Sequence, residues 1–370
     1  MSRATATAIV VGAGIVGAAC AEALAEAGVG VTVVEASFAA SGTTAAAMGH
    51  LVVMDDSEAQ FALTSLSRRM WTERAEELPA DCEDDACGTL WVAADEEEMG
   101  HVRRKAAFFA ARGEEAEVLD AAALREAEPN LRAGLAGGLL VPADRVLYPP
   151  NAARALLESA RRRGAVVREG TPVESVAPRK VRTRGGTLEA DAVVVTAGNA
   201  APRLVPGLTV VPRKGHLVVT ERAPGFLRHQ VVELGYLRSA HTMSSESVAF
   251  NVQPRKTGQL LIGSSRELVG EDASVNRELL RRMLARARDY MPAIGGLPAL
   301  RVWTGFRPAT PDKLPLIGAW EEGLLVAAGH EGLGITTAPA TGRLVADLLL
   351  GRRPALDPAP FDPTRRSARG

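Results

Sequence analysis

Three glycines near the N-terminus, Gly12, Gly14 and Gly17, have the G-x-G-x-x-G spacing of a dinucleotide-binding turn. A short apolar run, residues 8–11, precedes them and an alanine-rich stretch, 18–27, follows, which predicts a buried strand leading into a helix. The first glycine permits the tight turn, the second lets a pyrophosphate approach the backbone, and the third lets the helix pack on the strand. The phosphates lie at the helix N-terminus, where free N–H groups and the dipole favour anions. The sequence therefore predicts a bound dinucleotide.

A carboxylate follows the second strand of this unit. Residues 31–34 are apolar and end at Glu35, where a carboxylate can accept hydrogen bonds from both ribose hydroxyls. An acidic residue at this place disfavours a 2′-phosphate, so we do not expect NADP. The fingerprint alone does not separate NAD from FAD. The next segment, residues 39–49, consists mostly of small residues, which lets the backbone come close to a bulky ligand.

Composition excludes several classes of protein. The chain has 370 residues, with 43 Lys and Arg against 44 Asp and Glu, and this balance excludes a strongly basic nucleic-acid binder. Its three cysteines exclude a disulfide scaffold, and the spacing of Cys82 and Cys87 lacks a matching second pair, so we expect no metal site. No apolar run approaches the roughly 18 residues of a membrane span. Without an apolar leader at the N-terminus, we expect a cytoplasmic protein.

The strand patterns predict two kinds of sheet. Residues 192–198 and 323–329 are continuous apolar runs, typical of strands buried on both faces of a parallel sheet. Between about 205 and 303 the strands alternate more, as in an antiparallel sheet. The predicted fold class is α/β (mixed α+β), with a Rossmann-like cofactor domain and a mostly antiparallel substrate domain. The cofactor domain is discontinuous, at 1–80, 148–200 and 304–370, and the substrate domain takes 81–147 and 201–303. Two helices are expected at 57–78, capped by Ser57, and at 339–350.

Several segments after the fingerprint resemble the D-amino-acid oxidase superfamily of FAD enzymes, in its glycine oxidase and sarcosine oxidase branch. These segments are Ser41–Thr44, Val193–Gly198, Phe306–Asp312, Leu314–Gly318 and Ala328–Ile335. They stand in the order of the family, and the likeness runs nearly from end to end. The resemblance implies that the cofactor is FAD and that the chain is an FAD-dependent amino-acid oxidoreductase.

The resemblance also implies which residues hold the FAD. The segment after Glu35 would lie along the flavin and the pyrophosphate, and Val173 would contact the adenine side. The turn at 329–336 would aim N–H groups at the pyrimidine edge of the flavin, where reduction adds negative charge. The predicted set is Gly12, Ala13, Gly14, Ile15, Val16, Gly17, Glu35, Ala36, Gly42, Thr43, Thr44, Ala47, Met48, Gly49, His50, Val173, Ala197, Gly198, Gly329, His330, Glu331, Gly332, Leu333, Gly334, Ile335 and Thr336.

Arg307 is the first candidate for the substrate site. The resemblance places the carboxylate-binding arginine of related amine oxidases here, and a guanidinium matches a carboxylate with two parallel hydrogen bonds. His50 would face the flavin ring, where it could pack on the flavin, contact the substrate or hold the neutral amine. His330 would support the flavin loop. The predicted catalytic set is Arg307, His50, Tyr236, His241 and Asn251.

Departures from the glycine oxidase pattern bear on the substrate. Asn251 replaces a tyrosine, Arg266 a methionine and Gly332 a second arginine, which argues against glycine. The segments Met48–Leu51, Met54–Asp56, Gly235–Tyr236 and Asn251–Pro254 resemble the D-hydroxyproline dehydrogenases. We therefore expect hydride transfer from Cα of a D- or secondary amino acid to flavin N5, with cis-4-hydroxy-D-proline or D-proline as substrate. Glycine, sarcosine or an opine are the alternatives within the family, and a non-catalytic flavoprotein subunit is an alternative of another class.

The sequence leaves the identity of the electron acceptor open. The sarcosine oxidase branch has a lysine where this chain has Leu261, which favours a dehydrogenase over an oxidase. A quinone, a partner subunit and O2 are the possible acceptors. Some relatives assemble with small iron–sulfur subunits, so a homo- or hetero-oligomer is possible.

Overall fold

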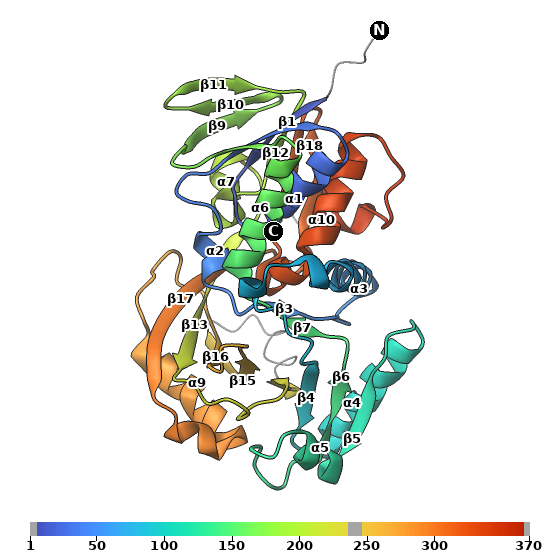
Figure 1. The fold of residues 1–370 in the computed structure, drawn as a ribbon, viewed down its shortest axis with the longest axis vertical. Coiled ribbons are helices and arrows are strands. Elements are labelled where there is room, and N and C mark those ends of the chain that lie inside the picture. The colour runs from blue at the N-terminus through green and yellow to red at the C-terminus, as the bar shows by residue number, and fades with distance from the viewer. Residues whose placement is uncertain (1–5, 236–245, 366–370) are drawn as a thin grey trace.

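Two large β-sheets organise the chain, one above the other in Figure 1. The computed structural model describes residues 6–235 and 246–365. Tyr236 and His241, two of the predicted catalytic residues, lie outside the described residues.

The upper sheet has six strands in the order β18-β19-β12-β1-β2-β8, and all neighbours are parallel except β18 and β19. The strands are β1 Thr7–Val11, β2 Gly30–Val34, β8 Val166–Arg168, β12 Ala192–Val195, β18 Leu316–Glu321 and β19 Leu324–Ala328. Ala8 and Val10 point into the helical side of this sheet, and Ile9 and Val11 into the other side. Both faces are buried, which explains the continuous apolar runs.

Helices cover one face of the upper sheet and a small antiparallel sheet covers the other (Figure 1). Helix α1 packs against α6 and α10, and α10 packs against α3. The helices of this part are α1 Ile15–Glu26, α2 Gly42–Ala45, α3 Glu58–Glu73, α6 Pro149–Arg162, α7 Ala201–Leu204 and α10 Gly334–Leu349. The small sheet consists of β9 Val173–Ala177, β10 Lys180–Thr183 and β11 Gly186–Glu189.

The lower sheet has eight strands in the order β17-β13-β16-β15-β14-β4-β6-β5, antiparallel except for the β14–β4 pair. Its strands are β4 Thr89–Ala93, β5 Glu117–Asp120, β6 Gly137–Val141, β13 Val211–Thr220, β14 Gln230–Glu233, β15 Glu246–Pro254, β16 Leu260–Glu267 and β17 Ala299–Ala309. Helix α9 packs on β15 and β16, and α4 packs on β4 and β6. The helices are α4 Glu96–Ala110, α5 Ala121–Ala127 and α9 Arg277–Tyr290.

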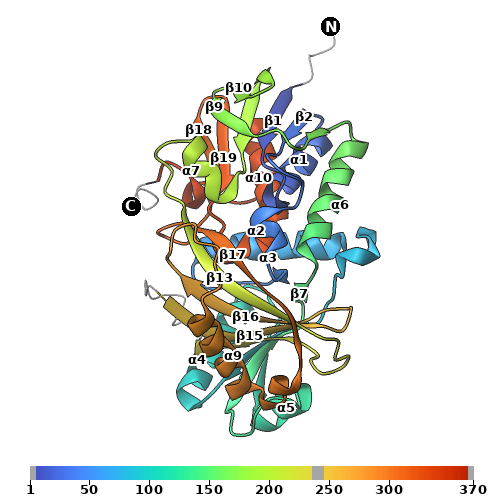
Figure 2. The same cartoon turned by 90° about the vertical axis from the view of Figure 1, so that its left-hand side faces the viewer.

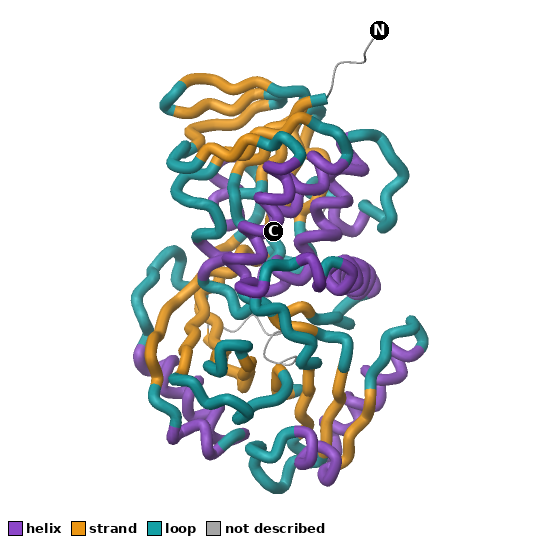
Figure 3. The backbone as a smooth tube through the Cα atoms, viewed as in Figure 1, coloured by secondary structure: helices purple, strands orange, loops and turns teal. Residues whose placement is uncertain are grey.

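The predicted fold class is confirmed, because a parallel sheet and a mostly antiparallel sheet are both present. The chain passes between them more than once, which the colours of Figure 2 follow from the N-terminus to the C-terminus, and Figure 3 shows the strands in orange. Strand β17 belongs to the lower sheet and runs across residue 304, where the sequence placed a boundary. The proposed division into residue ranges stays a prediction. None of the helices within 6–235 and 246–365 is long and apolar enough to cross a bilayer.

The predicted start of the last helix at Pro339 was wrong. Helix α10 begins at Gly334, so Pro339 lies inside it. A proline has no N–H to donate to the carbonyl four residues earlier, which leaves that carbonyl without its helical partner. Here the indole N–H of Trp71 in α3 donates to the Ile335 carbonyl at 3.0 Å. The distant tryptophan satisfies the carbonyl, and the helix tolerates the proline. The Ser57 cap of α3 is confirmed, since its side chain accepts from Gln60 N–H.

Candidate active site

The glycine turn between β1 and α1 can be formed only by residues without side chains. Gly12 has a φ of +107°, and a Cβ on it would lie 2.9 Å from the Thr196 carbonyl oxygen. A Cβ on Gly17 would lie 2.0 Å from the Gly12 carbonyl oxygen and 2.6 Å from Thr196 Oγ1. Strand β1, helix α1 and the end of β12 therefore meet at van der Waals distance. The backbone of the turn stays open to a ligand approaching the start of α1.

Two oxygen-bearing side chains flank the start of α1. Thr44 Oγ1 accepts from the Ile15 N–H at 3.0 Å. The Glu35 carboxylate accepts from the N–H of Ala13 at 2.8 Å and from that of Ser37 at 2.9 Å. These contacts fix the carboxylate at the end of β2, beside the glycine turn, and each oxygen keeps a lone pair for a ribose hydroxyl.

The small-residue segment after Glu35 lies between the two sheets. Thr43 Oγ1 donates to the Phe306 carbonyl of β17 at 2.8 Å. Gly49 has a φ of +112°, and a Cβ there would lie 1.9 Å from the Leu147 carbonyl oxygen. The Met48 carbonyl accepts a hydrogen bond from Gln253 Nε2 at 3.0 Å. The segment is thus held by contacts on both sides and leads into β3, His50–Leu51, which pairs with β7, Arg145–Val146.

The turn at 329–336 meets this segment from the opposite side. Thr336 Oγ1 donates to the His50 carbonyl at 2.8 Å and accepts from Val52 N–H at 3.3 Å. A Cβ on Gly334 would lie 3.9 Å from Val16, so the start of α10 lies beside the start of α1. Two helix N-termini, each favourable to negative charge, therefore lie on the same side of the upper sheet.

The other predicted cofactor residues lie around the edge of this region. Ala197 and Gly198 follow β12 directly, and Val173 begins β9. Thr171 N–H donates to the Glu35 carbonyl at 2.7 Å, which places the start of β9 near the end of β2. Ala36 is exposed.

A pocket brings together three of the predicted catalytic residues, one from each of three distant segments. Arg307 from β17, His50 from β3 and Asn251 from β15 all line it. His330, Glu331, Gly332 and Leu333 of the flavin-loop turn also line it, so the pocket joins the predicted cofactor segment to the lower sheet. The remaining lining residues are Val52, Met54, Asp56, Gln60, Trp91, Gln230, Val232, Arg266 and Lys313.

The lower sheet presents a row of side chains to this pocket. Trp91 of β4 is in register with Val232 of β14, which is in register with Asn251 of β15. Trp91 Nε1 and Asn251 Oδ1 are buried and have no hydrogen-bond partner among the described residues, and the same holds for Gln230 Oε1. Leaving buried polar atoms unpaired costs free energy, so such atoms point to a polar ligand. Trp91 and Gln230 were missed from the sequence, because nothing local distinguishes them from other strand residues.

Charged side chains line the same pocket. Arg266 is 5% exposed and lies on β16, in register with Ser247. Glu331 accepts an ion-pair hydrogen bond from Arg213 at 2.7 Å. Burial lowers the pKa of Lys313, although Asp56 and Glu331 act to raise it. Basic groups outnumber acidic ones in this wall, which favours an anionic ligand.

Both pocket histidines are neutral at physiological pH. Burial, followed by the nearby Arg307 charge, lowers the pKa of His50 from 6.5 to about 3. Burial alone lowers the pKa of His330 to about 3, and its Nε2 lies 3.1 Å from Thr341 Oγ1. The His330 ring thus contacts α10, and its role in supporting a flavin loop stays a prediction.

We expect His50→Gln to lower kcat/KM by about tenfold, because the pocket loses a neutral ring that is predicted to pack on the flavin, contact the substrate or hold the neutral amine. The pH at which kcat/KM rises should not move. Because its pKa is lowered to about 3, His50 is uncharged throughout the neutral range. Its removal therefore leaves the pH dependence of kcat/KM unchanged there. Kinetics between pH 6 and 10 check this, and an inflection near pH 6.5 that disappears in the variant would contradict it.

The residues around the glycine turn fit FAD. The backbone turn at Gly12 and Gly17, two residues without side chains, would bind the pyrophosphate. The Glu35 carboxylate would accept hydrogen bonds from the ribose hydroxyls. His50, at the end of the segment at 42–50, and residues 330–333 of the turn line the same pocket as Arg307, and a flavin ring would lie there. When bound, FAD supplies a hydride acceptor.

Comparison with known proteins agrees with this arrangement. The family model described as FAD dependent oxidoreductase matches residues 7–348. Glycine oxidase of Geobacillus kaustophilus is 33% identical over 96% of this chain and 96% of its own. A crystal structure of the enzyme from that organism matches with a TM-score of 0.87, at 32% identity over 98% of this chain and 100% of that one. The structure of an L-proline dehydrogenase from P. horikoshii matches with a TM-score of 0.86, at 26% identity over 98% of this chain and 97% of that one. The chain therefore belongs to the D-amino-acid oxidase family of FAD-dependent oxidoreductases, in its glycine oxidase-like branch, and is an amino-acid oxidoreductase.

Proposed function

We propose that the chain dehydrogenates a D-configured or cyclic secondary amino acid at Cα, with cis-4-hydroxy-D-proline as the favoured substrate. The observation that carries this is one pocket holding the Arg307 guanidinium and unpaired buried atoms of Trp91, Gln230 and Asn251. Arg307 binds the substrate carboxylate. A ring hydroxyl both donates and accepts, so it can satisfy the indole N–H of Trp91 and an amide oxygen at once.

The neutral side chains near the amine suit this chemistry. His50 stays uncharged and can accept from or pack against the amine without opposing its deprotonation. The Cα hydrogen would leave with its electron pair to the FAD acceptor and the N–H proton would leave to water, so that the nitrogen lone pair forms the C=N bond. For a proline the product is a pyrroline carboxylate. Orientation by Arg307 and exclusion of water supply the rate, so no strong base is needed.

The comparisons support a cyclic substrate only in part. The relative from P. horikoshii is an L-proline dehydrogenase, which acts on a cyclic secondary amino acid. The glycine oxidases support the amine chemistry. We propose that the electron acceptor is a quinone or a partner subunit and that the protein acts in the cytoplasm. The reason for this acceptor is that buried Leu261 on β16 stands where the sarcosine oxidase branch has a lysine. Oxygen uptake that matches substrate turnover would contradict that acceptor.

The test is anaerobic reduction of the bound flavin. The purified chain is mixed with cis-4-hydroxy-D-proline, D-proline, L-proline, sarcosine, glycine and a dicarboxylic opine, and the flavin absorbance is followed. We expect cis-4-hydroxy-D-proline to reduce it fastest. Equal rates with D-proline would remove the case for hydroxyl recognition, and no reduction by any amino acid would overturn the function.

A second candidate, an opine-type substrate with two carboxylates, is favoured by one observation. Arg266 is buried and lines the same pocket as Arg307. Its strand, β16, is separated from the β17 strand of Arg307 by β13. A second guanidinium there could take a second carboxylate. In the same panel, an opine that reduces the flavin faster than every monocarboxylate would select this candidate.

Asn251→Leu tests whether Asn251 recognises the ring hydroxyl, because leucine keeps the side-chain volume and removes the amide. Preference for cis-4-hydroxy-D-proline over D-proline, measured as the ratio of kcat/KM, should fall from about tenfold or more toward unity. The reason is that the ring hydroxyl loses a partner while D-proline loses none. Activity on D-proline is the internal control. If both substrates lose activity in proportion, Asn251 does not read the hydroxyl.

A further inference from the structure

The Arg307 guanidinium rests on the backbone of the neighbouring strand. Gly215 of β13 lies directly beneath it, since a Cβ there would be 2.4 Å from Arg307 Nη1 and 3.0 Å from Cζ. Arg307 Nη1 donates to the Ser265 carbonyl of β16 at 3.1 Å, reaching across β13. The position of the guanidinium therefore depends on where the Ser265 carbonyl lies.

Ser265 lies where the β13–β16 ladder is irregular. Lys214 pairs with Glu267 and Val218 pairs with Ile262, and the register of the two strands shifts between these pairs. In that gap the backbone N–H of His216 donates to Ser265 Oγ at 2.9 Å, and His216 Nδ1 lies 2.9 Å from the same oxygen. Both residues are fully buried. The serine hydroxyl thus replaces a ladder bond and joins the two strands beneath Arg307.

The loop before α9 sets the tautomer of His216. Asn276 N–H donates to His216 Nε2 at 3.0 Å, so Nε2 carries no hydrogen and the proton of the neutral ring is on Nδ1, facing Ser265 Oγ. Burial lowers the pKa of His216. The Lys214 and Arg307 charges act in the same direction and Glu267 opposes them, and the lowered pKa keeps the ring neutral.

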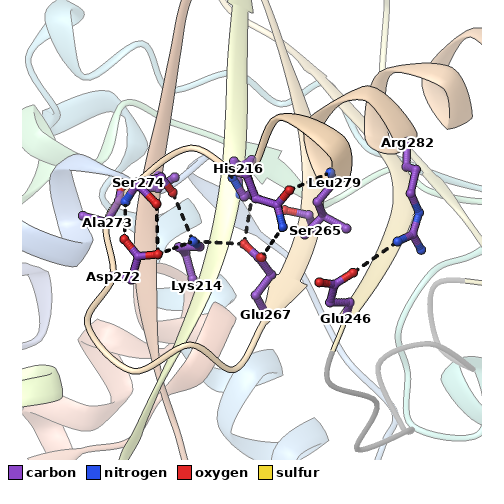
Figure 4. Close-up of polar contacts among 12 residues, drawn as sticks. Lys214, His216, Glu246, Ser265, Glu267, Asp272, Ala273, Ser274, Leu279 and Arg282 are labelled. Atoms are coloured by element: carbon purple, nitrogen blue, oxygen red, sulfur yellow. Dashed lines mark hydrogen bonds and ion pairs between the residues drawn. The ribbon is translucent and has the colours of Figure 1, made fainter.

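A buried ion pair holds this loop in place (Figure 4). Lys214 Nζ lies 3.2 Å from Glu267 Oε2 and donates to the Ser274 carbonyl at 3.0 Å. Asn276 Nδ2 donates to Glu267 Oε1 at 2.7 Å, and its Oδ1 accepts from Leu279 N–H as the cap of α9. The hydrogen bonds run from α9 through His216 and Ser265 to Arg307.

We propose that Ser265 and His216 are positioning residues that orient Arg307 for a substrate carboxylate. This rests on the proposed function, because it takes Arg307 as the carboxylate-binding residue. One N–H of the guanidinium is committed to the Ser265 carbonyl, and Arg307 also lines the pocket. Without the serine hydroxyl, two His216 donors lose their acceptor, the strands shift and the fork turns away.

The test compares two ligands that are not oxidised, pyrrole-2-carboxylate and its neutral carboxamide, by calorimetry on the flavin-loaded protein. Ser265→Ala should weaken the carboxylate about tenfold and leave the carboxamide within twofold. With substrate, KM should rise more than kcat falls. Ser264→Ala is the matched control, since its hydroxyl is buried in the same strand, makes no hydrogen bond to the described residues, and is not among the groups that line the pocket.

A second variant keeps the proposal testable if Ser265→Ala does not fold. His216→Gln can still accept from Asn276 N–H but offers no donor at the Nδ1 position, and we expect a smaller loss, about threefold, again confined to the carboxylate. Equal weakening of both ligands, or none, overturns the positioning role. If Arg307→Lys also fails to weaken the carboxylate selectively, the carboxylate role of Arg307 fails, whereas selective weakening by Arg307→Lys alone rejects only the positioning inference.

Discussion

Arg307→Lys is expected to lower kcat/KM for the amino-acid substrate by about 100-fold or more. Arginine can offer two parallel N–H groups to a carboxylate while a third holds the Ser265 carbonyl at 3.1 Å. Lysine keeps the charge, but its ammonium is a point charge without this planar fork. A carboxylate held by one bond can rotate, and a displacement of about 1 Å at the reacting carbon costs on the order of 100-fold.

The measurement is the anaerobic rate of flavin reduction against substrate concentration for both proteins. Arg301→Lys is the matched control, because Arg301 lies on the same strand but is exposed and contacts the Trp303 ring instead of the pocket. It should stay within twofold of the parent protein. If Arg307→Lys keeps more than a third of the parent activity, the carboxylate is bound elsewhere, and Arg266 becomes the first alternative.

The cofactor half of the site was predictable because its geometry is local. Gly12, Gly17 and Glu35 belong to one βαβ unit, whose spacing follows from strand and helix dimensions. The structure adds what spacing cannot supply: Thr196, which follows β12 far along the chain, comes within contact distance of a Cβ at either glycine. That contact explains why side chains are excluded at these two positions.

The substrate half was predictable only where a family motif marked it. Arg307 and Asn251 were found by resemblance, yet Trp91 and Gln230 were not. Their place in the pocket depends on β4 pairing with β14, a parallel pair in a sheet whose other pairs, among the described residues, are antiparallel. A shift of one residue in that register would turn Trp91 to the other face of the sheet. No pattern within either strand specifies the register.

A hydrogen bond from a distant residue also explains why the start of α10 was predicted at the wrong residue. Pro339 marks a helix start by local rules, because its missing N–H costs nothing in the first turn. The Trp71 indole donates to the carbonyl that Pro339 leaves open. Like the Ser265 hydroxyl beneath Arg307, it supplies from another element a hydrogen bond that the local backbone lacks. Both depend on tertiary contacts, which single-sequence rules do not contain.

Gly17→Ala should yield a protein that does not retain FAD, the largest effect expected on the cofactor side. The added Cβ would lie 2.0 Å from the Gly12 carbonyl oxygen, a backbone atom that cannot move without opening the turn. Moving α1 away from β1 displaces its N-terminal N–H groups from the pyrophosphate. We expect FAD affinity to fall by at least about 100-fold, on the scale of losing two or more hydrogen bonds to a charged group.

Retention is measured as the flavin-to-protein absorbance ratio after gel filtration, and affinity by titrating the apoprotein with FAD. Gly28→Ala is the matched control at the other end of the same helix: its φ of +83° strains an alanine, but a Cβ there meets nothing within 4 Å. That variant should lose about 1 kcal/mol of stability and keep its flavin. Added FAD should raise Tm in the parent and in Gly28→Ala but not in Gly17→Ala, because a ligand stabilises only a fold that binds it. A Gly17→Ala protein that binds FAD as tightly as the parent would show that the turn can open without losing its phosphate contacts.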